Sequence, residues 1–333
     1  MPARPGAPEI ALSVVVPLFN EQENLAELHR RLTETLAGLG VPYEILLVND
    51  GSRDATPRLV RNLQDGDPHL KALHLSRNFG HQAAVSAGLD HAKGRAVVVM
   101  DGDLQDPPEV IPRFLDHWRA GADVVYAVRR GRKEGALKRF GYFAFYRLLR
   151  AVSDIEIPLD SGDFALMDRR VVDALKALPE RTRFVRGLRT FVGFRQVGLD
   201  YDREARAAGR SKYPLHALVR LAVDGLVSFS GYPLRLVSYL GFLTAFVSLL
   251  LTVWVLSDAF YHHSAPRGWA SLAVLLLFVG SIQLISLGII GEYVRLIFLE
   301  SKGRPTYIVM NDRRLDRAQP LPPAPRSFAE ARR

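Results

Sequence analysis

The sequence predicts an α/β domain with a mainly parallel sheet, followed by a part that anchors the chain in a membrane. Short apolar runs alternate with amphipathic stretches over about the first 130 residues, and two long uncharged stretches follow further along the chain. Basic residues flank that pair on its outer sides. We therefore expect an α/β domain over 1–210, a juxtamembrane amphipathic helix over 211–235, two transmembrane helices within 236–291, and a C-terminal segment over 292–333.

The elements of the α/β domain follow from residue type and periodicity. Apolar runs, three of them rich in Val or Ile, predict strands at 12–17, 44–49, 70–76, 96–100 and 123–127. The stretches between them predict helices at 21–39, 55–64, 81–92 and 108–119, with a later helix at 169–178 and a short strand at 306–310. Strands that alternate with helices form a doubly wound, mainly parallel sheet, and such sheets bind ligands beyond the carboxyl ends of their strands.

The juxtamembrane segment carries a helical stripe. Apolar residues recur at 215, 218, 219, 222, 226 and 229, with Lys212 and Arg220 beside them. Because a long apolar stretch follows directly, we interpret this segment as a helix that lies in the membrane interface. An amphipathic helix packed on the α/β domain is the alternative.

Two stretches, 236–257 and 268–291, are long enough to cross a bilayer, which takes about 20 residues of helix. Neither has a polar face, which argues against buried core helices. Arg and Lys precede the first stretch and follow the second, whereas the connection between them carries only Arg267. By the positive-inside rule both termini and the α/β domain face the cytoplasm, so we expect an integral protein of the inner (plasma) membrane. The tail from about Arg317 is expected to be disordered.

Composition narrows the possible functions. Lys and Arg total 44 against 35 Asp and Glu, a net charge of +9, and there are no cysteines. The basic excess suits nucleic acid, anionic lipid or phosphorylated substrates. We do not expect nucleic-acid binding, because the basic residues cluster beside the apolar stretches. The missing cysteines exclude disulfides, thiolate metal sites and cysteine nucleophiles, and neither a dinucleotide fingerprint nor a Walker A loop is present.

Three D-x-D triplets compete as candidate ligand sites. Asp101 and Asp103 directly follow the apolar run 96–100, at the expected carboxyl end of a strand, as Asp50 does after 45–49. The triplet at 65–67 instead lies in a Gly/Pro turn, and the one at 200–202 lies among basic residues. Two carboxylates with Gln105 nearby offer the hard oxygen ligands that Mg²⁺ or Mn²⁺ prefer, so we expect a metal that holds a diphosphate there.

At these positions the sequence resembles family 2 glycosyltransferases of the GT-A fold. The blocks that carry the resemblance are VVVPLFNE (14–21), VNDGS (48–52) and MDGDLQDPP (100–108). Three more blocks are similar to polyprenyl-phosphate glycosyltransferases, both GtrB-like glucosyltransferases and the more distant dolichyl-phosphate mannose synthases: SRNFG (76–80), DSGDF (160–164) and GRSKY (209–213). The resemblance covers residues 12 to about 310, with the blocks in the family's order.

The resemblance implies an inverting transfer, in which a lipid phosphate attacks the anomeric carbon of a nucleotide sugar and releases the nucleoside diphosphate. It implies a role for each matching residue. Donor-binding residues would be Pro17, Asn20, Glu21, Asp50 and Asp101; metal ligands Asp101, Asp103 and Gln105; catalytic residues Asp103 and Asp163; and acceptor- or diphosphate-binding residues Arg129, Arg139, Ser161 and Lys212.

Several of these roles have alternatives. Asp163 is either a general base or a residue that orients the sugar or a cationic side chain, because a phosphate acceptor is already largely ionised at neutral pH. Relatives often carry Arg where this chain has Ala165. Any contact that this Arg makes in the relatives is therefore absent here or is supplied by Arg169 or Arg170. Asp50 could instead cap a helix, and Glu21 could be a first-turn acid. The basic stretch 129–139 is a solvated face, a lipid contact or, as we favour, a mobile acceptor loop. We assign no chemistry to His81.

The predicted function is transfer of a hexose from a nucleotide sugar, best UDP-glucose, to a polyprenyl phosphate such as undecaprenyl phosphate. GDP-mannose or another UDP-sugar is the alternative donor. A processive polysaccharide synthase is less consistent, since the chain lacks a Q-x-x-R-W motif and further spans, and an inactive scaffold is disfavoured by the intact acidic residues. The sequence leaves the formation of a homo-oligomer open.

Overall fold

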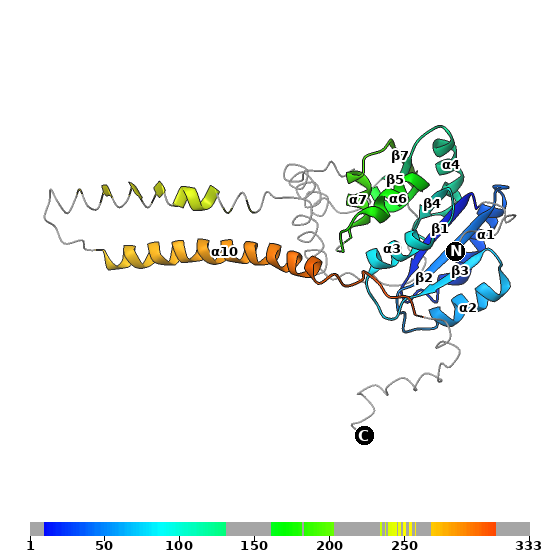
Figure 1. Ribbon diagram of the computed structural model, residues 1–333, viewed down its shortest axis with the longest axis horizontal. Coiled ribbons are helices and arrows are strands. Elements are labelled where there is room, and N and C mark those ends of the chain that lie inside the picture. Colours follow the sequence, from blue (N-terminus) through cyan, green and yellow to red (C-terminus); the bar gives the residue numbers. More distant parts are fainter. Residues whose placement is uncertain are drawn as a thin grey trace, which may run out of the picture.

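The α/β domain is built on one mixed sheet. The structure, a computed structural model, describes residues 10–130, 161–181, 183–202 and 268–310, with positions scattered through 234–257. The strands run in the order β3-β2-β1-β4-β6-β5-β7 (Figure 1). Their bounds are β1 Leu12–Leu18, β2 Tyr43–Asn49, β3 Leu70–His74, β4 Ala96–Val99, β5 Val124–Arg130, β6 Ser161–Asp168 and β7 Gln196–Asp202. Strands β1–β4 run parallel, as do β5 and β7, whereas β6 is antiparallel to both β4 and β5.

Helices cover both faces of the sheet, which confirms the predicted α/β class. On one face lie α1 (Leu25–Ala37), α2 (Thr56–Gly66) and, after a short 3₁₀ turn at Pro108–Val110, α4 (Ile111–Arg119). On the other lie α3 (His81–His91), α6 (Arg169–Ala177) and α7 (Val185–Phe191). Alternate residues of a strand point to opposite faces. In β1, accordingly, Val14 and Val16 join the first core and Val15 joins the second.

The first helix begins later than predicted. We expected it from residue 21, but α1 starts at Leu25 and a turn occupies 22–24. The backbone N–H of Glu21 donates to Thr56 Oγ1 at 3.0 Å, and that of Asn24 donates to the Glu21 carbonyl at 3.1 Å. These tertiary contacts hold the segment as a turn, so Glu21 is not in the first turn of the helix. The other strands and helices predicted between residues 12 and 178 have the expected type.

A glycine allows the close packing of α3 on the sheet. A Cβ on Gly88 would lie 2.1 Å from Cγ1 of Val15. No side chain can therefore be present at this position if α3 is to remain in contact with β1. Because α3 follows β3 after the loop 75–80, its amino end lies at the same edge of the sheet as the carboxyl ends of the parallel strands.

A long apolar helix follows the α/β domain. Helix α10 (Trp269–Ser301) begins one residue after the start of the predicted span 268–291 and continues ten residues beyond its end. Its segment Phe278–Ser301 is long and apolar enough to cross a membrane, with a mean hydropathy of 1.7, and is the one such segment among the described residues. The other predicted span, 236–257, is helical wherever it is described and lies beside α10 (Figure 1). A membrane helix there stays a prediction, and the juxtamembrane helix 211–235 and the tail from 317 lie almost entirely outside the described residues.

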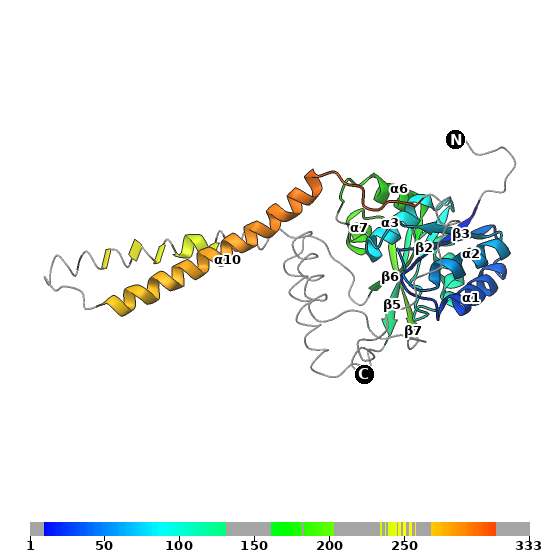
Figure 2. The ribbon, with the colours of Figure 1, turned by 90° about the horizontal axis from the view of Figure 1, so that it is seen from below.

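The chain returns from α10 to the α/β domain, as Figure 2 shows. Val309 forms an antiparallel bridge with Leu75, and the Ser76 N–H donates to the Ile308 carbonyl at 2.9 Å. The hydroxyl of Tyr307 donates to Asp90 Oδ2 at 2.8 Å. The strand predicted at 306–310 is thus present as a bridge. We call residues 303–310 the return segment.

Candidate active site

The predicted acidic residues come together at the edge of the sheet where β1, β2 and β4 end. Asp50 directly follows β2, and Asp101 lies two residues beyond the end of β4. The backbone turns sharply there: Asn20 has φ +54° and Leu104 has φ +60°. Such left-handed conformations cost free energy in residues other than glycine and persist only where the surrounding structure holds them. The order of the strands therefore places these side chains at one rim, as the sequence predicts.

Asp50 organises a loop and does not cap α2, the helix that follows it in the chain. Its Oδ1 accepts from the Phe79 N–H at 2.7 Å and its Oδ2 from the Gly80 N–H at 3.0 Å. Gly51 has φ +63°, and a Cβ there would lie 2.4 Å from backbone atoms of Arg77 and Asn78. The turn after β2 and the loop 76–80 therefore pack backbone against backbone. Burial raises the pKa of Asp50, and the two N–H donors oppose that rise.

The other predicted donor-binding residues lie at the end of β1 and in the turn after it. Pro17 is buried within β1. Asn20 accepts the Arg53 N–H on its Oδ1 at 2.9 Å, and Glu21 Oε2 accepts from Asn24 Nδ2 at 2.8 Å. These contacts join the ends of β1 and β2 into one wall. Its role in holding a nucleoside stays a prediction.

Asp101 and Asp103 form the acidic pair beyond β4. The Asp101 side chain is about 30% exposed, and Asp103 Oδ1 accepts the backbone N–H of Gln105 at 3.2 Å. Burial raises the pKa of Asp101 to about 6; His81 opposes the rise, and the charges of Asp106, Asp163 and Asp103 add to it. Such an accumulation of carboxylates favours a bound cation.

The donor set fits a divalent ion held partly by its substrate. Carboxylate oxygens are hard ligands, and Mg²⁺ or Mn²⁺ is commonly held by one or two carboxylates together with substrate phosphates. No group of three or more His, Asp or Glu side chains is arranged to hold a metal in the part of the chain that the structure describes. Asp101 and Asp103 alone would therefore leave coordination positions for a diphosphate.

Asp163 lies across from this pair because of the antiparallel strand β6. Val99 pairs with Ala165, so the residue two positions before Ala165 lies opposite the residue two positions after Val99. Asp163 Oδ2 accepts from Gln82 Nε2 at 3.0 Å and contacts His81 Nε2 at 3.1 Å. Its Oδ1 accepts from Arg186 Nε at 3.4 Å. Three side chains thus hold both oxygens of this carboxylate.

These contacts set the charge of the cluster. Burial would raise the pKa of Asp163, but the hydrogen bond from His81 and the charges of Arg186, His81 and Arg189 hold it well below its usual range. Burial would likewise lower the pKa of His81, but Asp163 and Asp101 raise it to about 9. At neutral pH Asp163 is therefore ionised, but its low pKa makes it a weak proton acceptor, whereas an efficient general base has a pKa near the working pH.

Sequence reasoning missed His81, Gln82, Arg186 and Arg189. His81 Nε2 lies 3.1 Å from Asp163 Oδ2 and 3.7 Å from Asp101 Oδ1, so it bridges the two acidic groups. Spacing along the chain gives no signal for this, because 82 positions separate His81 from Asp163. The available signal was its place directly after the SRNFG block, at the start of a predicted helix.

The predicted acceptor-binding residues are only partly described. The backbone of Arg129 lies near the end of β5, and Ser161 begins β6. Arg139 and Lys212 lie outside the described residues, as does the stretch 131–139 of the predicted acceptor loop.

Arg169 and Arg170 do not replace a contact at Ala165, because they lie at the opposite edge of the sheet. There the Arg169 side chain donates to the Ala92 and Gly94 carbonyls, and Arg170 pairs with Asp123. Ala165 itself is fully buried within β6. Arg186 is the guanidinium that contacts Asp163.

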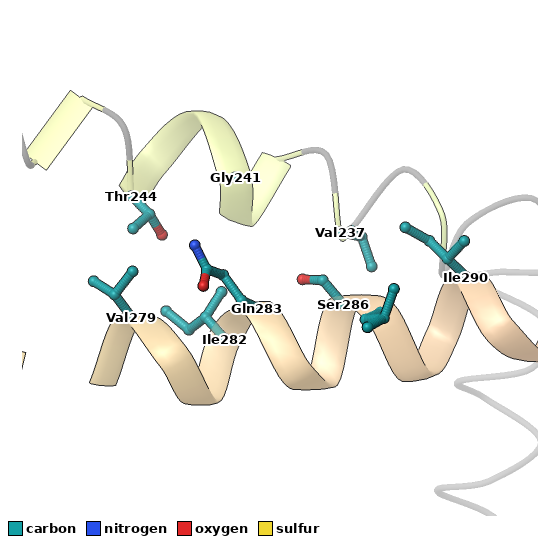
Figure 3. Close-up of a pocket in the computed structure, with 9 residues that line it drawn as sticks. Val237, Gly241, Thr244, Val279, Ile282, Gln283, Ser286 and Ile290 are labelled. Atoms are coloured by element: carbon teal, nitrogen blue, oxygen red, sulfur yellow. The ribbon is translucent and has the colours of Figure 1, made fainter. Parts of the chain in front are cut away.

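A cavity of about 410 Å³ lies elsewhere, between α10 and the apolar segment beside it (Figure 3). Thr244 and Gln283 point toward each other across it, and Val237, Ser286 and Ile290 line it further along. None of the acidic residues described above contributes to it. The cavity belongs to the helix pair and not to the candidate active site.

Comparison with known proteins identifies the family. The model of glycosyl transferase family 2 matches residues 13–176. A bactoprenol glucosyl transferase of Shigella phage SfV is 43% identical over 91% of this chain and 99% of its own length. The chain belongs to glycosyl transferase family 2. This glycosyltransferase is also 46% identical to an uncharacterised glycosyltransferase, YkcC of Bacillus subtilis, over 90% of the chain and 93% of that protein. A prophage bactoprenol glucosyl transferase homologue of Escherichia coli is 41% identical over 90% and 98%.

Solved structures show a weaker likeness. Glucosyl-3-phosphoglycerate synthase from Mycobacterium tuberculosis, in complex with Mn²⁺, UDP and glucosyl-3-phosphoglycerate, has a TM-score of 0.49 at 19% identity and covers 69% of this enzyme and 87% of that chain. S. aureus TarS 1-349 with UDP-GlcNAc has a TM-score of 0.41 at 18% identity, covering 66% and 67%. The family assignment rests on the sequence relatives.

Proposed function

We propose that this glycosyltransferase moves a hexose from a nucleotide sugar, best UDP-glucose, to the phosphate of a polyprenyl phosphate, best undecaprenyl phosphate, with inversion. One observation carries the proposal: the Asp101/Asp103 pair faces the Asp163 cluster across the ends of β4 and β6, on a domain that continues into an apolar helix. The bactoprenol glucosyl transferases, 41–43% identical over about nine tenths of the chain, support the same substrate class.

The donor would lie at the ends of β1, β2 and β4. Asp50 and the turn at 17–21 would hold the nucleoside, and Asp101, Asp103 and Gln105 would hold a Mg²⁺ or Mn²⁺ ion at the diphosphate. That ion would supply a positive charge to balance the charge on the departing diphosphate. Asp101 and Asp103 contribute by fixing the position of the diphosphate relative to Asp163, and so the direction from which the acceptor attacks.

The acceptor would approach from the side of β6 and α7. Its phosphate has a second pKa near 6 and is largely ionised at neutral pH, so attack on the anomeric carbon needs no general base. We infer that Asp163 positions cationic groups, consistent with the three donors on its carboxylate. Arg129, Arg139, Ser161 and Lys212 would contribute further contacts to the phosphate or the diphosphate.

The apolar helices would place this site at the cytoplasmic face of the plasma membrane. The 33 residues of α10 span about 50 Å at 1.5 Å per residue, against about 30 Å for the hydrocarbon core. The end of α10 would therefore extend beyond the bilayer toward the catalytic domain, where the Glu300 carboxylate accepts the Arg181 N–H at 2.9 Å. Both chain termini would be cytoplasmic. Cysteines placed singly at 263 and at 320, labelled with an impermeant maleimide in intact cells, test this topology: only the first should react.

The function is tested by product formation. The purified full-length enzyme is incubated with undecaprenyl phosphate, Mg²⁺ or Mn²⁺, and radiolabelled UDP-glucose, other UDP-sugars or GDP-mannose in turn. Butanol-extractable label from UDP-glucose, lost in Asp103→Ala, is the expected result. Label only from GDP-mannose or from another UDP-sugar would correct the donor, and no lipid product from any donor would overturn the proposal.

A further inference from the structure

Arg189 is a buried cation, and some of its guanidinium N–H groups have no hydrogen-bond partner in the described structure. The residue is 2% exposed, and neither Nε nor Nη2 of its guanidinium has a hydrogen-bond partner within the described structure. The guanidinium carbon lies 5.2 Å from the centroid of the Tyr126 ring, within the range of a cation–π contact. Buried donors without partners are costly, and a guanidinium binds oxyanions through such in-plane N–H groups. The open donors therefore point to an anionic ligand.

A second guanidinium lies in front of it. Arg186 is three residues earlier on α7, so the two side chains leave the helix on neighbouring positions of one face. The Arg186 side chain is about 23% exposed and reaches Asp163 with Nε at 3.4 Å. Arg186 thus connects the exposed part of the site with the buried Arg189. Burial lowers the pKa of Arg189 to about 10, and the charge of Asp163 opposes that shift, so Arg189 is cationic at neutral pH.

The carboxylate in this cluster does not balance the two guanidiniums. Asp163 carries one negative charge, and its Oδ2 also accepts hydrogen bonds from Gln82 and His81. The Gln82 amide is oriented for this contact, because its Oε1 accepts the Val185 N–H at the start of α7 at 2.8 Å. α3 and α7 therefore hold Asp163 as a fixed anion beside an excess of positive charge, which favours a second anion.

We propose that Arg186 and Arg189 form a subsite for the phosphate-monoester head of the acceptor, with Asp163 as its fixed counter-ion. The inference rests on the proposed function, which supplies an acceptor of that chemistry. Two planar guanidiniums match the several oxygens of a phosphate monoester. The donor diphosphate has its own expected place at Asp101 and Asp103, on the β1 and β4 side of the rim, whereas α7 packs beside β6. Arg186 is expected to contact the phosphate first and Arg189 to bind it from behind.

Binding without catalysis tests the subsite. The full-length protein in detergent is titrated calorimetrically with farnesyl phosphate, farnesol, inorganic phosphate and UDP, with no donor sugar present. We expect Arg189→Gln to weaken farnesyl phosphate binding by about tenfold or more, the loss typical of a charge-assisted hydrogen bond, and to change UDP binding less than about twofold. Arg189→Lys should recover part of the affinity, since it keeps the charge. The control Arg195→Gln, at an exposed arginine before β7, should change neither.

Each other outcome decides against the subsite. Weaker UDP binding with unchanged farnesyl phosphate binding would assign the guanidiniums to the leaving diphosphate. Binding of inorganic phosphate without farnesyl phosphate would make the subsite one for free phosphate. No change in any affinity, in a variant with the wild-type thermal midpoint, would make Arg189 purely structural. If Arg189→Gln does not fold, the same titrations are made with Arg186→Gln, because Arg186 is partly exposed, and their result decides between these outcomes.

The result is separable from the proposed function. Should the wild-type enzyme form no lipid product from any donor while Arg189-dependent binding of farnesyl phosphate holds, the transfer reaction is wrong and the subsite stands. If product forms but farnesyl phosphate binding is independent of Arg186 and Arg189, the transfer reaction stands and the subsite is wrong.

Discussion

Gln82 donates to Asp163 from Nε2 at 3.0 Å, across 81 positions of the chain. The same amide accepts the Val185 N–H, so it joins the start of α3, the start of α7 and the carboxylate on β6. An amide in this position is neutral and has one orientation that satisfies both neighbours. The geometry therefore makes Gln82 a positioning residue for Asp163.

Gln82→Glu should reduce kcat by about tenfold or more. The new carboxylate would lie close to Asp163 Oδ2, and two carboxylates at that distance disfavour each other's charged form. The Val185 N–H would keep its acceptor, so the fold should persist. Initial rates with varied donor and acceptor give kcat and both KM values. Gln64→Glu, an exposed position on α2, is the control, and an unchanged kcat in Gln82→Glu would contradict the role.

Asp103→Ala should reduce activity by at least about 100-fold, because a metal site is expected to contribute several kcal/mol to the transition state. Asp65→Ala removes an exposed carboxylate of another D-x-D triplet, at the end of α2, and should have no effect. Chelation with EDTA should abolish wild-type activity, and added Mn²⁺ or Mg²⁺ should restore it. Full activity in EDTA would rule out the metal site.

Glu44 should make the stability of the domain fall in acid. Glu44 is 2% exposed and accepts from Ser13 Oγ at 2.6 Å, the Lys93 N–H at 2.7 Å and Lys71. Burial alone would raise its pKa, but these hydrogen bonds and the charge of Lys71 outweigh burial and lower it. The contribution is therefore fully present above the unfolded pKa of about 4.3 and is lost as the pH falls through the lower folded value.

The expected result for Glu44→Gln is a loss of about 1–3 kcal/mol at pH 7, because a buried set of donors loses its charged acceptor. Between about pH 6 and pH 3 the thermal midpoint should fall less in the variant than in the wild type. Glu34→Gln, at an exposed surface pair with Arg30, serves for comparison. Parallel pH curves for wild type and Glu44→Gln would show that Glu44 does not carry this dependence.

Tyr307→Phe should loosen the return segment. The substitution removes the 2.8 Å hydrogen bond to Asp90, worth about 1 kcal/mol, and keeps the ring that packs near His91. Hydrogen exchange in peptides covering 74–80 and 303–310 should accelerate together by about fivefold, because the Ser76 and Met310 N–H groups donate across this contact. Tyr239→Phe, on the apolar segment beside α10, should leave both peptides unchanged. Acceleration in only one of them would mean that the two segments open independently.

The sequence predicts the donor side of the site well, because local patterns determine it. The runs 45–49 and 96–100 have the apolar character of buried strands, and residues that follow parallel strands meet at one rim. Asp50, Asp101 and Asp103 therefore come together as expected. Their binding of a nucleotide or metal stays a prediction.

The acceptor side depends on an arrangement that no local pattern contains. The run 161–168 has too little alternation to identify β6 as a strand, and its antiparallel placement between β4 and β5 breaks the order that a doubly wound sheet predicts. That placement brings Asp163 opposite Asp101, with His81 between them. The start of α1 cannot be predicted from local patterns either, because it depends on a tertiary contact, the hydrogen bond from the Glu21 N–H to Thr56 Oγ1.

The bridge between Leu75 and Val309 can form only late in the synthesis of the chain. β3 is the outermost strand at one side of the sheet, and the stretch that bonds just beyond its carboxyl end is translated only after the apolar residues 236–301. At roughly 5–20 residues per second, the ribosome needs on the order of tens of seconds to pass from one to the other. Throughout that interval this sheet edge is open to pairing with other chains. The nascent catalytic domain is therefore most prone to aggregation until residues 303–310 have been translated, and slower translation of the stretch before them should lower the yield of folded enzyme.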